Sequence, residues 1–134
     1  MKYSILADTG PLYAAVDRDD QYHQRAHDEL RAIAEAGAEV IVAYPTILEA
    51  YTLVLYRLGK RVASGWLAEL RAGVALINPI VEDYRQASHK ASGYRDQSIT
   101  LFDATVAVIA ERMALPVWTY DHHFDTMRTP VWRR

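Results

Sequence analysis

The chain is predicted to form an α/β domain with a mostly parallel central sheet. Short apolar segments recur along it, and most are followed by longer segments in which apolar residues have helical spacing. This alternation is typical of parallel strands joined by helical crossovers. The 134 residues, 51% of them hydrophobic, are enough for one ordinary domain with a sizeable core. We therefore expect residues 1–134 to form a single domain.

Four apolar segments are predicted to be strands because each is short and rich in apolar or β-branched residues. They are Lys2–Ala7, Val40–Ala43, Val74–Ile77 and Pro116–Thr119. Asn78 and Pro79 end the third segment, and Pro130–Trp132 could add an edge strand.

The segments between these strands are predicted to be helical. In chain order they are a short helix around Leu12–Val16, then Gln21–Ala36, Pro45–Leu58, Arg61–Arg71, Val81–Ala91 and Phe102–Met113. Asp19 or Asp20 could cap the second helix, and Gly37 and Gly59 suit helix ends. Phe102–Met113 is apolar almost all round, which predicts deep burial. The stretch "YDHHFD" is expected to form a short turn or helix.

Charge and composition exclude several classes. The net charge is −2, so binding of nucleic acid would need a local basic patch rather than a global attraction. There are no cysteines, which excludes disulfides and thiolate metal sites. The N-terminus lacks the pattern of a signal peptide, and no apolar run is long enough to span a bilayer. We therefore expect a cytoplasmic protein with no membrane association.

Four carboxylates stand in apolar surroundings: Asp8, Glu49, Asp103 and Asp121. A buried carboxylate is costly unless it is paired, hydrogen-bonded or bound to a metal. Neither Glu49 nor Asp103 has a lysine or arginine three or four residues away, where a helical partner would lie. Asp8 and Asp121 directly follow predicted strands, whose carboxyl ends hold the sites of parallel sheets.

Each of these carboxylates, taken singly, also has a purely structural explanation. Asp8 could be a turn residue, Glu49 an exposed helix residue, Asp103 a residue favoured by the helix dipole and Asp121 an N-cap. Taken together, their positions predict convergence at one edge of the sheet. Crowded carboxylates raise one another's pKa, and a divalent cation such as Mg²⁺ relieves that repulsion.

Other catalytic classes fit less well. Asp8-Thr9-Gly10 is the tripeptide of aspartic-protease loops, but those enzymes need an all-β frame and a second such loop. A haloacid dehalogenase-type phosphatase would place a second aspartate where Gly10 stands. A glycine-rich phosphate-binding loop is absent from the sequence.

Three stretches resemble the PIN-domain family, most closely its VapC-type toxin ribonucleases. "ILADTGPLYAAVDRDDQYHQRA" resembles the family's first strand and first acid, and "YPTILEAYTLVLYRLG" its helix with the second acid. "ITLFDATVAVIAERMALPVWTYDHHF" resembles the buried helix and last strand that carry the third and fourth acids. Gly10 and the Tyr44-Pro45 helix entry depart from the common pattern. The resemblance implies an α/β/α sandwich with a PIN-like fold.

It further implies an endoribonuclease that depends on Mg²⁺ or Mn²⁺ and leaves 5′-phosphate and 3′-hydroxyl ends. Asp8, Glu49, Asp103 and Asp121 would be its metal-binding and catalytic acids. Thr9, Thr119 and Asp125 would support them. The implied partners are an RNA substrate and a small antitoxin whose helix binds in a groove, and we also expect a homodimer.

Two alternatives stay open: a PIN-domain nuclease of RNA processing without a toxin role, and a non-catalytic PIN-like binding module. His122 and His123 are interpreted as surface residues, because adjacent side chains usually diverge. Basic residues gather at one helix junction, Arg57, Lys60 and Arg61, and at the C-terminus, Arg128, Arg133 and Arg134. They could hold an RNA backbone or form a solvated surface.

Overall fold

The computed structural model describes residues 3–134. Its centre is a four-stranded, all-parallel sheet, formed by β1 (Ser4–Ala7), β2 (Glu39–Ala43), β3 (Ala75–Ile77) and β4 (Val117–Trp118), in the order β3-β2-β1-β4. The four predicted strands and the parallel sheet are thereby confirmed. Lys2, predicted to begin the first strand, lies outside the described residues. The expected edge strand at Pro130–Trp132 is only a single parallel bridge between Val131 and Val117.

Seven helices are found in residues 3–134. They are α1 (Thr9–Ala14), α2 (His23–Glu35), α3 (Tyr44–Leu58), α4 (Lys60–Gly73), α5 (Val81–Ser92), α6 (Leu101–Met113) and α7 (His123–Thr126). All six predicted helices are present, and the "YDHHFD" stretch contributes α7. Gly37 and Gly59 take left-handed φ angles of 68° and 92°, which explains why α2 and α3 end there.

The expected cap of α2 is wrong. Its N-cap is Tyr22, whose side chain makes no capping hydrogen bond. Asp20 instead accepts a 2.8 Å hydrogen bond from the Tyr22 backbone N–H through its side chain, two residues along. This local loop bond is a common alternative use of an aspartate.

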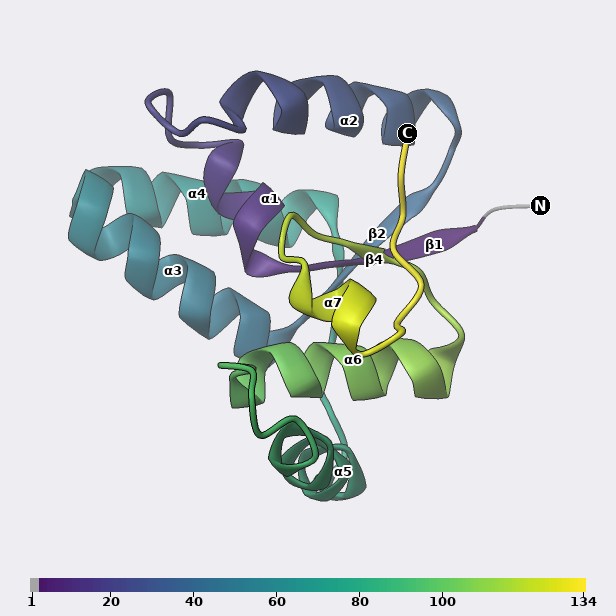
Figure 1. Ribbon diagram of the computed structural model, residues 1–134. Coiled ribbons are helices and arrows are strands. Elements are labelled where there is room, and N and C mark those ends of the chain that lie inside the picture. The colour runs from purple at the N-terminus through teal and green to yellow at the C-terminus, as the bar shows by residue number, and fades with distance from the viewer. Residues whose placement is uncertain (1–2) are drawn as a thin grey trace.

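Alternating strand residues pack into two layers, one on each face of the sheet. Ile5, Val42 and Trp118 belong to a core shared with α1, α2, α3 and α4. Leu6, Ile41 and Val117 belong to a second core shared with α6 and α7. Figure 1 shows α2 and α4 above the sheet and α6 below it, with α5 outside α6. The predicted α/β/α sandwich is therefore confirmed, and the two-residue period of the strands is its cause.

Helix α6 is the deeply buried helix that its composition predicts. Its middle, residues 104–110, is buried throughout. On its outer side α5 is attached by a bidentate ion pair, in which Arg112 donates to both oxygens of buried Asp83 over 2.8 Å. Arg112 lowers the pKa of Asp83, which keeps this buried carboxylate charged.

The strand order contains a topological switch point, where the connections begin to run to the opposite side of β1. From β1 the chain proceeds outward to β2 and β3, and it then crosses to β4 on the other side of β1. The register pairs Ala7 with Trp118, so the residues that follow these two strands emerge side by side. Binding sites of open parallel sheets lie at such a switch point, beyond the carboxyl ends of the strands. No helix among the described residues has the length and apolar character of a membrane span.

Candidate active site

The four predicted acids line a single cavity of about 530 Å³ at the carboxyl edge of the sheet. Asp8 directly follows β1, and Asp121 is the third residue after β4. Glu49 lies on the second turn of α3 and Asp103 on the first turn of α6. Four segments that are far apart in the sequence therefore contribute one carboxylate each. The prediction that these acids converge agrees with this geometry.

Asp8 lies deepest and is only 7% exposed. The Thr119 hydroxyl donates to its Oδ2 over 2.8 Å, and the Asp8 backbone N–H donates to the Trp118 carbonyl over 2.9 Å. Burial raises the pKa of Asp8 to about 7, against the opposing hydrogen bonds from Thr119 and the Thr9 backbone. The charges of Asp103 and Glu49 raise it further. Full ionisation of the acids in the metal-free site is therefore unfavourable.

Glu49 is half-buried, and the Thr9 hydroxyl donates to its Oε1. Burial raises the pKa of Glu49, and the charges of Asp103 and Asp121 add to that rise while the Thr9 hydrogen bond opposes it. The interpretation of Glu49 as an exposed helix residue is therefore wrong. Thr9 and Thr119 each donate a hydrogen bond to one of the acids.

Asp103 has two roles in the structure. It forms a capping box at the start of α6, where its backbone N–H donates to Thr100 Oγ1 over 3.1 Å and its Oδ2 accepts from the Thr100 N–H over 3.4 Å. Its side chain is also only 13% exposed and lies on the cavity wall. Burial and then the charge of Asp121 raise its pKa. Helix capping and a place in the site are thus compatible.

Asp121 is partly exposed, with 34% of its side chain accessible to solvent. Its Oδ1 accepts a 2.9 Å hydrogen bond from the His123 backbone N–H at the start of α7, and its own N–H donates to Thr119 Oγ1 over 3.0 Å. Thr119 therefore connects Asp8 to the loop that carries Asp121.

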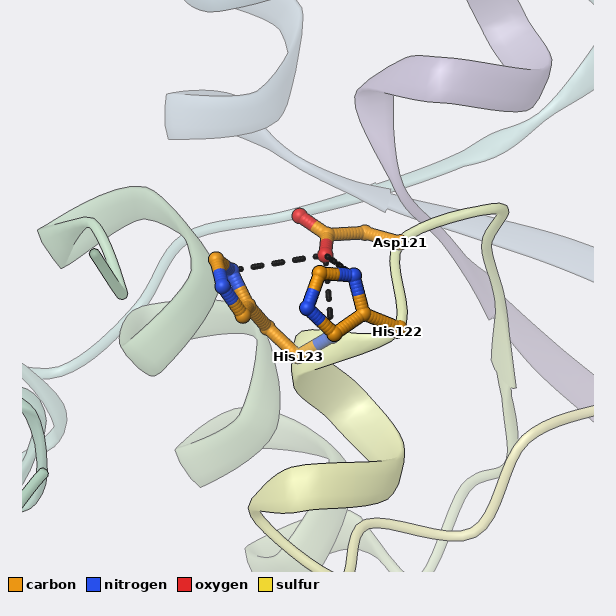
Figure 2. Close-up of side chains that lie close together, drawn as sticks. All are labelled: Asp121, His122 and His123. Carbon is orange, nitrogen blue, oxygen red and sulfur yellow. Dashed lines mark hydrogen bonds and ion pairs between the residues drawn. The ribbon is translucent and has the colours of Figure 1, made fainter. Parts of the chain in front are cut away.

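The interpretation of His123 as a surface residue is wrong. Its side chain is 15% exposed, and Nδ1 lies 3.4 Å from both Asp103 Oδ2 and Asp121 Oδ1. His122 is 77% exposed, with Nδ1 3.8 Å from Asp121. Figure 2 shows both rings beside the Asp121 carboxylate. The position of His123 depends on how α7 packs against α6, which no local sequence signal reveals.

Asp125 does not belong to this cavity. It is 59% exposed and forms an ion pair with Arg133 over 3.2 Å. Two further buried carboxylates escaped the sequence reasoning, and both are satisfied without a metal. Asp83 pairs with Arg112, and Glu29 accepts from Trp118 Nε1 over 3.2 Å and from the Tyr120 hydroxyl over 2.5 Å. Asp83 and Glu29 each lie within ion-pair distance of an arginine, whereas no lysine or arginine in residues 3–134 does so for Asp8, Glu49 or Asp103.

The donor set suits a hard divalent cation. Carboxylate oxygens are the ligands that Mg²⁺ and Mn²⁺ prefer. A cation would stabilise the charged form of Asp8, whose pKa is raised mainly by burial and further by the charges of Asp103 and Glu49. Among residues 3–134, the group with possible ligand atoms all within 4.8 Å of one another is Asp121, His122 and His123. We favour the carboxylates as ligands, because His122 is mostly exposed and His123 already contacts two acids.

Comparisons with known proteins agree with this geometry. Among solved structures, the chain is similar to the Mycobacterium tuberculosis toxin VapC20, which cleaves the sarcin–ricin loop. Their TM-score is 0.85 at 20% identity, with 97% of this chain and 99% of that chain covered.

It is also similar to VapBC2 of Rickettsia felis, solved with a DNA fragment from its promoter. The TM-score is 0.76 at 12% identity, with 99% of this chain and 98% of that one covered. For FitAcB of Neisseria gonorrhoeae the TM-score is 0.67 at 20% identity, and coverage is 96% of both chains. These TM-scores show a shared fold.

By sequence, none of the curated proteins matches the chain. The sequence model of the PIN domain matches residues 5–129, a span that runs from β1 to beyond α7 and includes all four acids of the cavity. The chain therefore belongs to the PIN-domain family.

Proposed function

We propose that this chain is an endoribonuclease that depends on Mg²⁺ or Mn²⁺, and that it acts as the toxin of a VapBC-type toxin–antitoxin pair. The observation that carries the nuclease proposal is the convergence of four acids from four segments on one cavity at the switch point of the sheet. The fold shared with VapC20, VapBC2 and FitAcB supports the toxin proposal.

Asp8, Glu49, Asp103 and Asp121 would hold the cation. It would supply positive charge to the phosphodiester and activate water for attack. The protein's own residues set up the rest of the reaction. Thr119 and Thr9 orient Asp8 and Glu49 through their hydroxyls. His123 holds Asp103 and Asp121 at a fixed separation. Asp121, whose side chain is 34% exposed, can accept the proton of an attacking water.

The nuclease proposal is tested with purified protein free of any antitoxin, incubated with labelled structured RNA and Mn²⁺ or Mg²⁺. We expect cleavage that EDTA stops and added Mn²⁺ restores. A single-stranded DNA of the same sequence serves as the comparison substrate. Cleavage that continues undiminished in EDTA would show that the metal mechanism is wrong. Absence of cleavage on every RNA, from protein with a native circular dichroism spectrum, would favour a binding module.

The toxin proposal needs a separate test in cells. Expression of the chain alone should slow bacterial growth, and co-expression of a small antitoxin encoded beside it should restore growth. Growth arrest should disappear in the Glu49→Gln variant at equal expression. Harmless expression of folded, RNA-cleaving protein would instead favour the alternative of an RNA-processing nuclease.

A further inference from the structure

Arg57 contributes a positive charge to a cavity that is otherwise rich in carboxylates. Asp20 lines it in addition to the four acids, and Arg57 lines the same cavity. Among the lining residues in the described part of the chain, Arg57 is the one arginine, and no lysine lines it. A polyanionic substrate that approaches four carboxylates needs positive charge beyond that of a bound cation. Arg57 is therefore the cavity-lining residue whose positive charge could bind a second phosphate.

Its place on α3 follows from helical spacing. Glu49, Leu53 and Arg57 are spaced by four residues, and all three line the cavity. Residues at this spacing share one face of a helix. Eight residues correspond to about 12 Å along the helix axis. The backbone of Arg57 thus lies two turns beyond Glu49 on α3, which favours a phosphate farther along the strand.

The guanidinium of Arg57 is held in place by an aromatic ring rather than by a carboxylate. Its Cζ lies 5.1 Å from the centroid of the Tyr13 ring, and Tyr13 is 4% exposed. The Tyr13 hydroxyl donates to Asp17, which fixes the ring. No carboxylate in residues 3–134 lies within ion-pair distance of Arg57. Asp17 is nonetheless close: the hydrogen bond from Tyr13 lowers its pKa most, and the charge of Arg57 lowers it further. Stacking on Tyr13 orients the guanidinium, and because it makes no ion pair its N–H donors can turn to a phosphate.

The neighbouring cations of the helix junction are placed differently. Lys60 Nζ donates to the Tyr51 hydroxyl over 2.9 Å, and neither Lys60 nor Arg61 lines the cavity. At the other end of the chain, Arg133 is paired with Asp125. The structure therefore separates Arg57 from the basic residues that stand beside it in the sequence.

We infer that Arg57 binds a phosphate of the RNA strand next to the scissile one, and so sets how the strand lies across the acids. This inference rests on the proposed nuclease function and deepens it. Arg57 is a positioning residue, because it lies two turns of α3 away from Glu49 and acts on substrate binding rather than on the reacting atoms. Its loss should affect KM far more than kcat.

The test compares Arg57→Ala, Arg57→Lys and a matched control, Arg71→Ala, which removes an exposed arginine that does not line the cavity. Steady-state cleavage of a labelled RNA oligonucleotide is measured in Mn²⁺ at several salt concentrations. Arg57→Ala should raise KM about tenfold with kcat nearly unchanged, and Arg57→Lys should recover part of that loss. The slope of log KM against log salt should fall by about 0.7, the value for one phosphate contact on a single strand. Arg71→Ala should match wild type.

Other outcomes separate the two proposals. If wild type does not cleave RNA, the proposed function fails, and the inference about Arg57, which rests on it, is overturned with it. If wild type cleaves and Arg57→Ala has the same KM and salt slope, only the role of Arg57 is overturned. Equal losses in Arg57→Ala and Arg71→Ala would indicate a general charge effect and also overturn it. A variant that cleaves normally but escapes its antitoxin would assign Arg57 to the protein partner instead.

A structural role for Arg57 would appear in a melting experiment. Arg57→Gln keeps much of the side chain's length and removes its charge. We expect its melting temperature, in EDTA, to stay close to that of wild type while KM rises as in Arg57→Ala. A large fall in melting temperature with unchanged KM would overturn the inference in favour of a packing role against Tyr13.

Discussion

Thr119 and Asp8, which are 111 residues apart in the sequence, share a buried 2.8 Å hydrogen bond at the switch point of the sheet. The bond exists because β4 lies beside β1, so that the residues following these strands emerge together. It is the one side-chain hydrogen bond to Asp8 in the described chain, and it partly offsets the burial that raises the pKa of Asp8 to about 7. The stability of the metal-free protein should therefore depend on pH through Asp8.

Asp8 binds its proton more tightly in the folded chain, with a pKa of about 7, than in the unfolded chain, where the value is 3.8. Stability should be fully present below the lower value and should fall as pH rises through the higher one. The loss is at most about 4 kcal/mol, since one pKa unit corresponds to about 1.4 kcal/mol. Because this loss accumulates between the two pKa values, urea unfolding in EDTA from about pH 4 to about pH 8 measures it.

Asp8→Asn should remove most of this pH dependence, because asparagine does not ionise. Glu49 and Asp103 also have raised pKa values, so part of the dependence should stay. Asp19→Asn, at an exposed loop position, is the control and should keep the wild-type profile. A wild-type profile in Asp8→Asn would mean that Asp8 is not the group that titrates.

Thr119→Val keeps the shape of the side chain and removes the hydroxyl that stabilises the charged form of Asp8. The pKa of Asp8 should then rise further, by about one unit, given a net hydrogen-bond energy of about 0.5–1.5 kcal/mol. The pH at which metal-free stability is lost should shift upward by the same amount. Comparison of Thr119→Val with the double variant Asp8→Asn/Thr119→Val provides the control, because the shift should vanish once Asp8 cannot ionise.

Glu49→Gln should lose cleavage while its circular dichroism spectrum stays native, because the amide keeps the shape and removes a metal-binding charge. Thr9→Val, which removes only the hydroxyl that orients Glu49, should cost about 10–100-fold in activity or metal affinity. The loss in Glu49→Gln should be the larger of the two. Glu35→Gln, at the exposed end of α2, is the matched control. Wild-type turnover in Glu49→Gln would remove Glu49 from the site.

Mn²⁺ should raise the melting temperature of wild type, because a ligand that binds only the folded state stabilises it by mass action. Asp103→Asn should gain much less from Mn²⁺. Asp103 also caps α6, so the stability of the Asp103→Asn variant in EDTA reflects both weakened capping and relieved repulsion. The change in melting temperature on addition of Mn²⁺ is therefore the informative quantity.

The same melting experiment distinguishes the two possible ligand groups. If the carboxylates hold the cation, His122→Ala should respond to Mn²⁺ as wild type does, since His122 is mostly exposed. If Asp121, His122 and His123 hold it, His122→Ala should lose the response and Asp103→Asn should keep it. That second pattern would contradict the proposed metal site.

Local patterns in the sequence were sufficient for the kinds of element and for their order. Short apolar runs predict the strands, apolar spacing predicts the helices, and glycines mark the ends of α2 and α3, because these preferences act within a few residues. The position of Asp8 and Asp121 after strands predicts the edge at which they lie. The absence of a helical partner beside Glu49 and Asp103 indicates that these acids need another explanation.

Only the tertiary structure decided which side chains meet. The order β3-β2-β1-β4 brings Thr119 to Asp8, and the packing of α7 against α6 buries His123 between Asp103 and Asp121. Arg57 and Lys60 are three residues apart in the sequence. The tertiary structure nevertheless places Arg57 on the cavity wall, whereas Lys60 donates a hydrogen bond to Tyr51. The physical reason is that a side chain's direction depends on the rotation of its helix and on what packs against it. Both follow from burial of the whole core, which is a property of distant residues together rather than of any one stretch.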